Sequence, residues 1–227
     1  MKLYSKLSAL GAVLVLSAAF ASATTISINS NAGSTVYAAY APSGAPGTNH
    51  GVLGTQYNLS GVTPTWAAPI GSSSWVGVTA TAGPGGVNPD KGNYTFTYAL
   101  GSNLIGYGGT LSVLADDTTS VYLNGTLLVP QAGGTDGHCE SGLPNCLEVF
   151  DVGLPGGASF SAGANTLKFI VLQAGTGTGG GSGDPSGLDF SGSITNTPEP
   201  STLLLFGTGL IGSAGALLRR MRASSSK

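Results

Sequence analysis

The stretch TLSVLADDTTSVYLNGTLLV, residues 110–129, places a turn signal between two runs of strand-forming residues. Asn124-Gly125 lies between Ser120–Leu123 and Thr126–Val129. A two-residue hairpin turn of type I′ needs positive φ at both central positions, and asparagine and glycine adopt that conformation most readily. The sequence therefore predicts a β-hairpin here.

Other segments show the two-residue period of a strand. Tyr94–Tyr98 alternates aromatic residues with threonine, which places three rings on one face and the hydroxyls on the other. Thr110–Leu114, Leu167–Leu172 and Phe190–Ile194 are also predicted strands, and no segment of the middle of the chain has a sustained helical period. With 38 glycines in 227 residues, the chain is predicted to be an all-β sandwich of about eight to ten short strands.

The chain between the two ends is acidic. Residues 24–196 contain nine carboxylates but only two cations, Lys91 and Lys168, for a formal charge of −7. Binding to nucleic acid requires clustered Lys and Arg side chains, so we expect no nucleic-acid partner.

The N-terminus has the pattern of a secretory signal peptide. Two lysines precede the apolar stretch Leu7–Phe20, and Ala21 and Ala23 are the small residues that signal peptidase requires at positions −3 and −1. An uncleaved anchor is the alternative, but the apolar run is short for a membrane span. The sequence predicts removal of residues 1–23 and a mature chain that begins at Thr24.

Export makes the two cysteines interpretable. Cys139 and Cys146 enclose a short segment with glycine and proline, and in an oxidising compartment such a pair is expected to form a disulfide. A metal site that adds His138 is the alternative, although it lacks a visible fourth ligand. His50 stands alone and is interpreted as a solvated loop residue.

Several segments in the middle of the chain carry a resemblance: Ser74–Val76, Asn93–Thr97, Leu114–Asp117, Val121–Gly125 and Ala162–Phe169. In this order they resemble the galactose-binding-like jelly rolls of secreted bacterial proteins, over residues 69–194. The resemblance implies a jelly-roll fold more firmly than sugar binding, because relatives of this kind include carbohydrate-binding modules, accessory domains of enzymes and domains without a known ligand.

Catalytic groups are hard to assign in this domain. The sequence lacks a Gly-x-Ser-x-Gly motif, and Asp116 and Asp117 are neighbours that point apart on an extended chain, so they form no catalytic dyad. We interpret the two aspartates as residues that end one strand and begin the next, with a calcium or sugar contact as the alternative.

Trp66 and Trp75 either stack on a sugar ring or pack in the core. The glycine-rich segment 175–187 is interpreted as a loop, because no helix follows it as a nucleotide site requires. We expect no enzyme activity, no metal and no cofactor.

The C-terminal segment 197–227 has three ordered elements. Pro198, Glu199, Pro200 and Ser201 precede residues 202–218, which are seventeen residues without charge, and then come Arg219, Arg220 and Arg222. A span of about 20 residues crosses a bilayer, so this run is just long enough with its flanks, and the arginines would stay in the cytoplasm.

This order resembles the PEP-CTERM sorting signal of exported bacterial proteins. The resemblance implies that an exosortase, a membrane protease and transpeptidase, cuts at or near Pro-Glu-Pro and releases the outer part to the cell surface or an extracellular polysaccharide matrix. A plain membrane anchor is the alternative, but it gives no reason for the Pro-Glu-Pro motif.

Two functions of different classes follow from the sequence. The first is an exported, non-catalytic surface or matrix protein whose β domain, residues 24–196, contacts polysaccharide. The second is a secreted glycan-active enzyme whose catalytic carboxylates are not identified. Signal peptidase and an exosortase are the expected processing partners.

Overall fold

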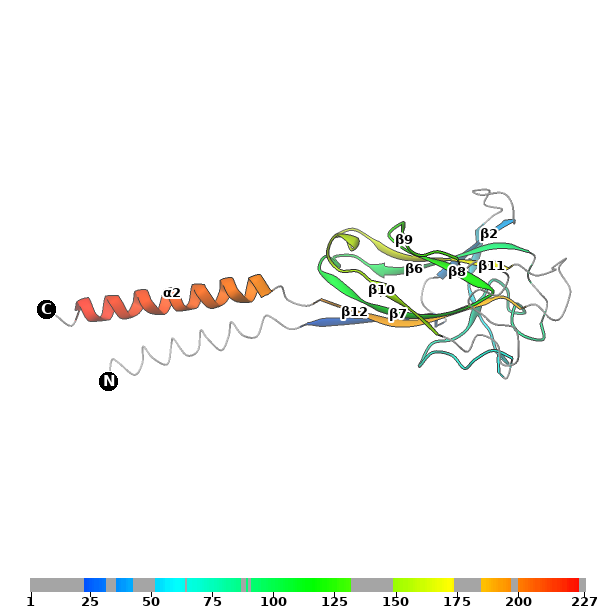
Figure 1. Ribbon diagram of the computed structural model, residues 1–227, viewed down its shortest axis with the longest axis horizontal. Helices are drawn as coiled ribbons and strands as arrows, with labels where there is room; N and C mark the ends of the chain where they lie inside the picture. The colour runs from blue at the N-terminus through cyan, green and yellow to red at the C-terminus, as the bar shows by residue number, and fades with distance from the viewer. Residues whose placement is uncertain are drawn as a thin grey trace. The chain divides into compact units, whose positions relative to one another are not determined.

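The computed structural model describes residues 23–31, 36–42, 52–63, 65–86, 89, 91–131, 149–173, 185–196 and 200–224. The chain divides into two compact units. Thr25–Thr195 forms a β domain, and the second unit contains the ends of the chain, including the helix α2 (Pro200–Ser224) (Figure 1).

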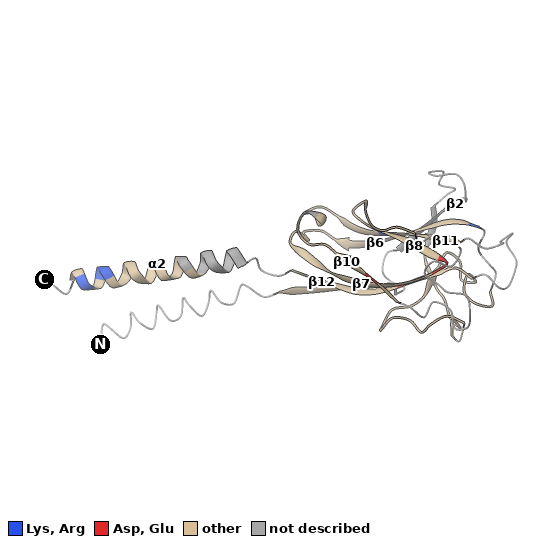
Figure 2. Ribbon diagram, viewed as in Figure 1, with Lys and Arg blue, Asp and Glu red and all other residues tan. Residues whose placement is uncertain are grey.

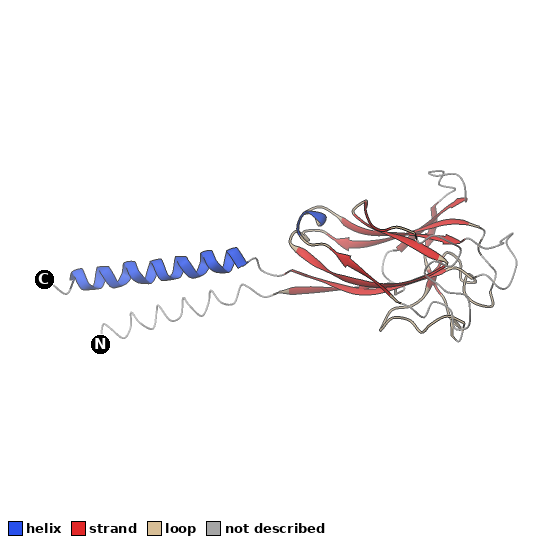
Figure 3. Cartoon of the chain, viewed as in Figure 1, coloured by secondary structure: helices blue, strands red, loops and turns tan. Residues whose placement is uncertain are grey.

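The β domain contains two sheets of six strands each among the described residues (Figure 3). The first sheet has the order β10-β7-β12-β5-β4, with β1 added beside β12. Its strands are β1 (Thr24–Asn29), β4 (Tyr57–Asn58), β5 (Val76–Gly77), β7 (Tyr107–Asp116), β10 (Phe150–Leu154) and β12 (Gly187–Asn196). The second sheet has the order β3-β2-β6-β11-β8-β9. Its strands are β2 (Val36–Pro42), β3 (Val52–Thr55), β6 (Gly92–Gly101), β8 (Thr118–Leu123), β9 (Thr126–Val129) and β11 (Asn165–Gln173). A short 3-10 helix, η1, spans Gly157–Ser159.

The predicted hairpin is confirmed. β8 and β9 pair antiparallel with Leu123 opposite Thr126, so the loop has two residues. Asn124 and Gly125 have φ values of 50° and 83°, which is the positive φ that the turn type demands.

The strands predicted from alternation are also confirmed. β6 and β11 are antiparallel neighbours in the second sheet, with Phe96 opposite Phe169. Tyr94 and Phe96 are buried and Tyr98 is half-buried, so the three rings share the inner face as predicted. The structure has twelve strands in its described part, slightly more than the eight to ten expected, because β4 and β5 are only two residues long and carry no periodic signal.

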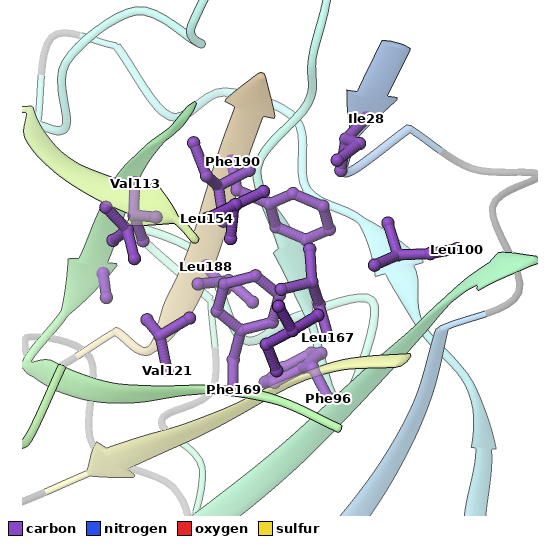
Figure 4. Close-up of a cluster of buried hydrophobic side chains, with 14 of the residues drawn as sticks. Ile28, Phe96, Leu100, Val113, Val121, Leu154, Leu167, Phe169, Leu188 and Phe190 are labelled. Atoms are coloured by element: carbon purple, nitrogen blue, oxygen red, sulfur yellow. The ribbon is translucent and has the colours of Figure 1, made fainter. Parts of the chain in front are cut away.

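The main core lies between the inner faces of the two sheets (Figure 4). Phe169 of β11 and Phe190 of β12 stack across the gap, with ring centroids 4.6 Å apart and planes 21° from parallel. Tyr98 meets Phe190 edge to face at 5.6 Å. Truncation of one such buried ring typically costs about 3–5 kcal/mol, so these contacts are a principal link between the sheets.

A smaller cluster adjoins the first sheet. It contains the fully buried rings of Trp66 and Trp75 together with four aliphatic residues, Leu59, Val62, Ala82 and Leu114. Gly187, at the start of β12, provides the space for the two rings, because a Cβ atom there would lie 2.7 Å from Trp66 Cη2. This cluster packs the long segment between β4 and β6 against the sheet.

Candidate functional site

The C-terminal unit contains one long described helix. α2 spans Pro200–Ser224, so Pro200 and Ser201 begin the helix, whereas Pro198 and Glu199 lie outside the described residues. The helix therefore begins within the Pro-Glu-Pro motif, at its second proline. Proline fits the first turn of a helix, where its missing N–H would have no intrahelical partner.

The basic end of the helix agrees with the predicted order of elements. Arg219, Arg220 and Arg222 lie within α2 near its C-terminal end (Figure 2). Cations are favourable there because the helix dipole is negative at that terminus. Within the side chains that the structure describes, no helix combines the length and the apolar character that crossing a membrane requires. The membrane span predicted for residues 202–218 stays a prediction.

The N-terminal processing site falls at the edge of the described structure. Ala21 and the rest of the predicted signal peptide up to residue 22 lie outside the described residues. Ala23 is exposed and directly precedes β1, which begins at Thr24. The predicted mature N-terminus is therefore also the first residue of a strand.

Trp66 and Trp75 are stacked on one another, with centroids 4.3 Å apart and planes at 28°. Both side chains have 0% exposure. The Trp66 indole N–H donates to Asp116 Oδ2 at 2.6 Å, and the Trp75 N–H donates to the Ala67 carbonyl at 3.0 Å. Neither ring has a face open to a sugar, so their interpretation as ligand contacts is corrected to core packing.

Asp116 and Asp117 are likewise buried, at 4% and 3% exposure. β7 ends at Asp116 and β8 begins at Thr118, as the interpretation of the pair as strand ends predicted. The carboxylate of Asp116 accepts from the Trp66 indole and its carbonyl accepts from the Ser186 hydroxyl at 3.2 Å. A surface ligand does not reach either side chain in this structure.

Cys139, Cys146, His138 and His50 lie outside the described residues, so the predicted disulfide and its metal alternative stay predictions. Among the residues described, no group of three or more His, Cys, Asp or Glu side chains could hold a metal ion.

A third buried carboxylate, that of Asp189, was missed from the sequence. Asp189 of β12 is 0% exposed and accepts from the Ser30 hydroxyl at 2.8 Å and from the Ile70 backbone N–H at 2.8 Å. Gln56 lies close by and donates through Nε2 to the Ser30 and Asn31 carbonyls at 3.1 and 3.2 Å. These bonds tie the end of β1 to the segment before β5, which is a structural role. In the sequence, the one indication of this role is that Asp189 interrupts the apolar run Gly-Leu-Asp-Phe. Strand alternation alone cannot distinguish such a buried aspartate from an exposed one.

An open depression lies at one end of the sandwich, beside the β8–β9 turn. It measures about 430 Å³ and is lined by Asn124, Thr126, Ser159, Ser161, Ala164 and Thr166. We call it the polar depression. It joins the hairpin turn to η1 and to the start of β11, three segments that are distant in the sequence.

Two asparagines form the frame of the polar depression. Asn165 is 1% exposed, and its Nδ2 donates to the carbonyls of Gly101, Ser161 and Gly163 at 2.9–3.2 Å. Its Oδ1 accepts from the Ser161 N–H and from Asn124 Nδ2, both at 2.8 Å. The turn residue Asn124 therefore has a second role besides its positive φ: it fixes the hairpin to the β11 loop.

The observed class is thus a two-sheet β domain followed by a helical tail with an arginine cluster at its end. Residues 196–222 match the PEP-CTERM protein-sorting motif. The chain therefore carries the sorting signal that marks an exported, surface-sorted protein and a substrate of an exosortase. No curated protein matches the sequence.

Solved structures give more distant similarities. A family 35 carbohydrate-binding module from Clostridium thermocellum aligns at 10% identity and a TM-score of 0.31, over 76% of this chain and 99% of that chain. A cleaved adhesin domain of Lys-gingipain from Porphyromonas gingivalis aligns at 16% identity and a TM-score of 0.37, over 78% and 99%. A GH31 α-xylosidase from Xanthomonas citri aligns at 12% identity and a TM-score of 0.30, over 77% of this chain and 17% of that chain.

Proposed function

We propose that this chain is a non-catalytic protein of the cell surface or extracellular matrix, delivered there by its C-terminal sorting signal. The observation that carries the proposal is the match of residues 196–222 to the PEP-CTERM motif, directly after the last strand of the β domain. The motif begins at Asn196, where β12 ends, so the β domain is complete before the sorting signal starts.

In this scheme the chain is processed at both ends. Signal peptidase removes residues 1–23, and the run 202–218 holds the chain in the membrane with the arginines in the cytoplasm. The exosortase then cuts at or near Pro198-Glu199-Pro200. Such a cut removes nothing from the core, because Ile194 is the last fully buried residue of β12.

A structural role for the buried carboxylates supports the non-catalytic part of the proposal. Asp116 and Asp189 are each held by hydrogen bonds within the β domain and are closed to solvent. General acid or base catalysis requires a carboxylate within reach of a substrate, which these two lack. The galactose-binding-like jelly roll remains our interpretation of the two-sheet sandwich, and the proposal needs no cofactor.

We further propose that the β domain contacts extracellular polysaccharide. The chain has few charged residues, 8% of its length, and is rich in Gly, Ser and Thr, which suits a hydrated matrix. The alternative is a protein that its C-terminal helix anchors in the membrane without any sorting. This alternative does not explain the match to the sorting motif.

The mass of the mature protein from its native host tests the sorting. We expect a chain that begins at Thr24 and ends near residue 200. A mature chain that still contains Arg222 would contradict exosortase processing, and turnover of any glycan by the purified protein would contradict the non-catalytic role.

A further inference from the structure

The hydroxyl groups of the polar depression lack hydrogen-bond partners in the part of the protein that the structure describes. Four of its six lining residues are Thr126, Ser159, Ser161 and Thr166, and none of their side-chain hydroxyls makes a hydrogen bond among the described residues. A serine or threonine hydroxyl offers one donor and two acceptor sites. The depression therefore presents a set of unused donors and acceptors to whatever enters it.

The backbone around these hydroxyls is firmly held. Asn124 Nδ2 donates to the Ser159 carbonyl at 2.8 Å, and Asn124 Oδ1 accepts from the Thr166 N–H at 2.9 Å. Asn165 holds the Ser161 backbone on both its N–H and its carbonyl. Both amides are engaged in this frame. The backbone that carries the hydroxyls is therefore held in place before a ligand binds, which lowers the entropy cost of binding.

The charge of the site selects among polar ligands. None of the described residues that line the depression has an ionisable side chain, and the apolar groups among them are the methyls of Ala164, Thr126 and Thr166. A phosphate, sulfate or uronate would lose hydration here without meeting a cation, and residues 24–196 carry a formal charge of −7 that repels anions further. A neutral polyol meets neither penalty, and its hydroxyls match the donors and acceptors of the wall.

We infer that the polar depression is a binding site for a neutral saccharide unit of an extracellular polysaccharide. The volume of about 430 Å³ lies within the range of roughly 300–1,000 Å³ found for small-ligand sites. None of the described lining residues is aromatic, so we expect one saccharide unit to bind weakly and retention to depend on many units along a polymer. The inference rests on the proposed contact with polysaccharide and locates that contact in the polar depression.

Affinity electrophoresis of the full chain in a mild non-ionic detergent tests the site. Native gels contain a neutral glucan, galactan, mannan or xylan, with alginate as the anionic comparison. The double variant Thr126→Val and Thr166→Val removes two hydroxyls while it keeps the β-branched shape that strands favour. Thr110→Val is the matched control, because Thr110 is an exposed threonine of β7 outside the depression.

We expect the wild type and the control to be retarded by at least one neutral polysaccharide and not by alginate. The double variant should bind that polymer at least fivefold more weakly, with an unchanged unfolding temperature. Equal retardation of the double variant and the wild type would refute this site while the proposed polysaccharide contact stands. A wild type that no neutral polymer retards would remove the contact itself, and retardation by alginate alone would overturn the argument from charge. The C-terminal mass still tests sorting independently.

Discussion

The stability of the β domain should depend measurably on one hydrogen bond, that from the Trp66 indole N–H to Asp116. Both partners are buried, and the indole N–H lies 2.6 Å from Oδ2 of the carboxylate. Trp66→Phe keeps an aromatic ring in the cluster but removes the donor. The carboxylate of Asp116 then loses this donor.

Trp75 supplies a matched comparison within the same cluster. Its side chain is equally buried and stacks on Trp66, but its N–H donates to a neutral backbone carbonyl, that of Ala67, at 3.0 Å. Trp75→Phe deletes the same atoms, so the cavity costs of about 1–2 kcal/mol largely cancel between the two variants.

The difference in the free energy of unfolding between the two variants then shows whether the acceptor is charged or neutral. A hydrogen bond to a charged group contributes about 1.5–3 kcal/mol and one to a neutral group about 0.5–1.5 kcal/mol. We therefore expect Trp66→Phe to lower the free energy of unfolding by about 1–1.5 kcal/mol more than Trp75→Phe. For a domain of this size that is roughly 2–6 °C in the unfolding temperature.

Urea unfolding followed by far-UV circular dichroism measures both variants without relying on tryptophan fluorescence. Asp116→Asn, alone and combined with Trp66→Phe, completes a double-mutant cycle that isolates the pair. If the two Trp→Phe variants lose the same stability within about 0.3 kcal/mol, Asp116 acts as a neutral acceptor and the reasoning is wrong.

Three further predictions concern single side chains of the β domain. Burial raises the pKa of the Tyr98 phenol, partly opposed by its hydrogen bond to the Asn29 backbone. The folded state therefore favours the protonated phenol, and this stability is complete below about pH 10 and lost as the pH rises through the raised pKa. Tyr98→Phe should reduce the loss of stability between about pH 10 and 12 in urea titrations, and an unchanged pH profile would contradict this. Gly187→Ala should lower the free energy of unfolding by about 1–3 kcal/mol, because the added Cβ would overlap the two indole rings. Gly153→Ala in β10 is the control: its Cβ meets open space and should change the free energy of unfolding by less than about 0.5 kcal/mol. Equal losses of stability in the two variants would refute the packing argument. Asn165→Ala removes five hydrogen bonds of a buried amide and should cost about 2–4 kcal/mol in thermal unfolding, so a loss below about 1 kcal/mol would show that the frame is dispensable.

The strands were predictable from the sequence where local chemistry decides them. Asn124-Gly125 requires positive φ wherever it stands in a hairpin, and alternation over Tyr94–Tyr98 defines an inner face without knowledge of the partner strand. The two-residue strands β4 and β5 have no such local signal, because their pairing depends on β12 and the segment between them.

The places of the candidate ligand residues were not predictable in the same way. A tryptophan in a loop is exposed or buried according to what folds over it, and Trp66 and Trp75 are covered through the space left by Gly187, more than a hundred residues later in the sequence. The polar depression depends on a similar long-range contact, since Asn124 and Asn165 meet only when β8 and β11 pair. Local patterns show that these residues are polar or aromatic but not which of them meet.

The pairing of β1 with β12 links the fold to its processing. The Thr25 and Thr195 hydroxyls lie 3.0 Å apart, and the Ser30 N–H donates to the Phe190 carbonyl at 3.0 Å, so the first and last strands of the β domain are bonded along their length. β1 starts at the first residue of the predicted mature chain, and β12 ends two residues before Pro198. Because β1 pairs with β12, the first sheet is complete only when the chain is present through residue 196. Cuts at the two predicted sites fall outside both strands, so processing in either order preserves every hydrogen bond of the pair and releases a domain whose core is intact.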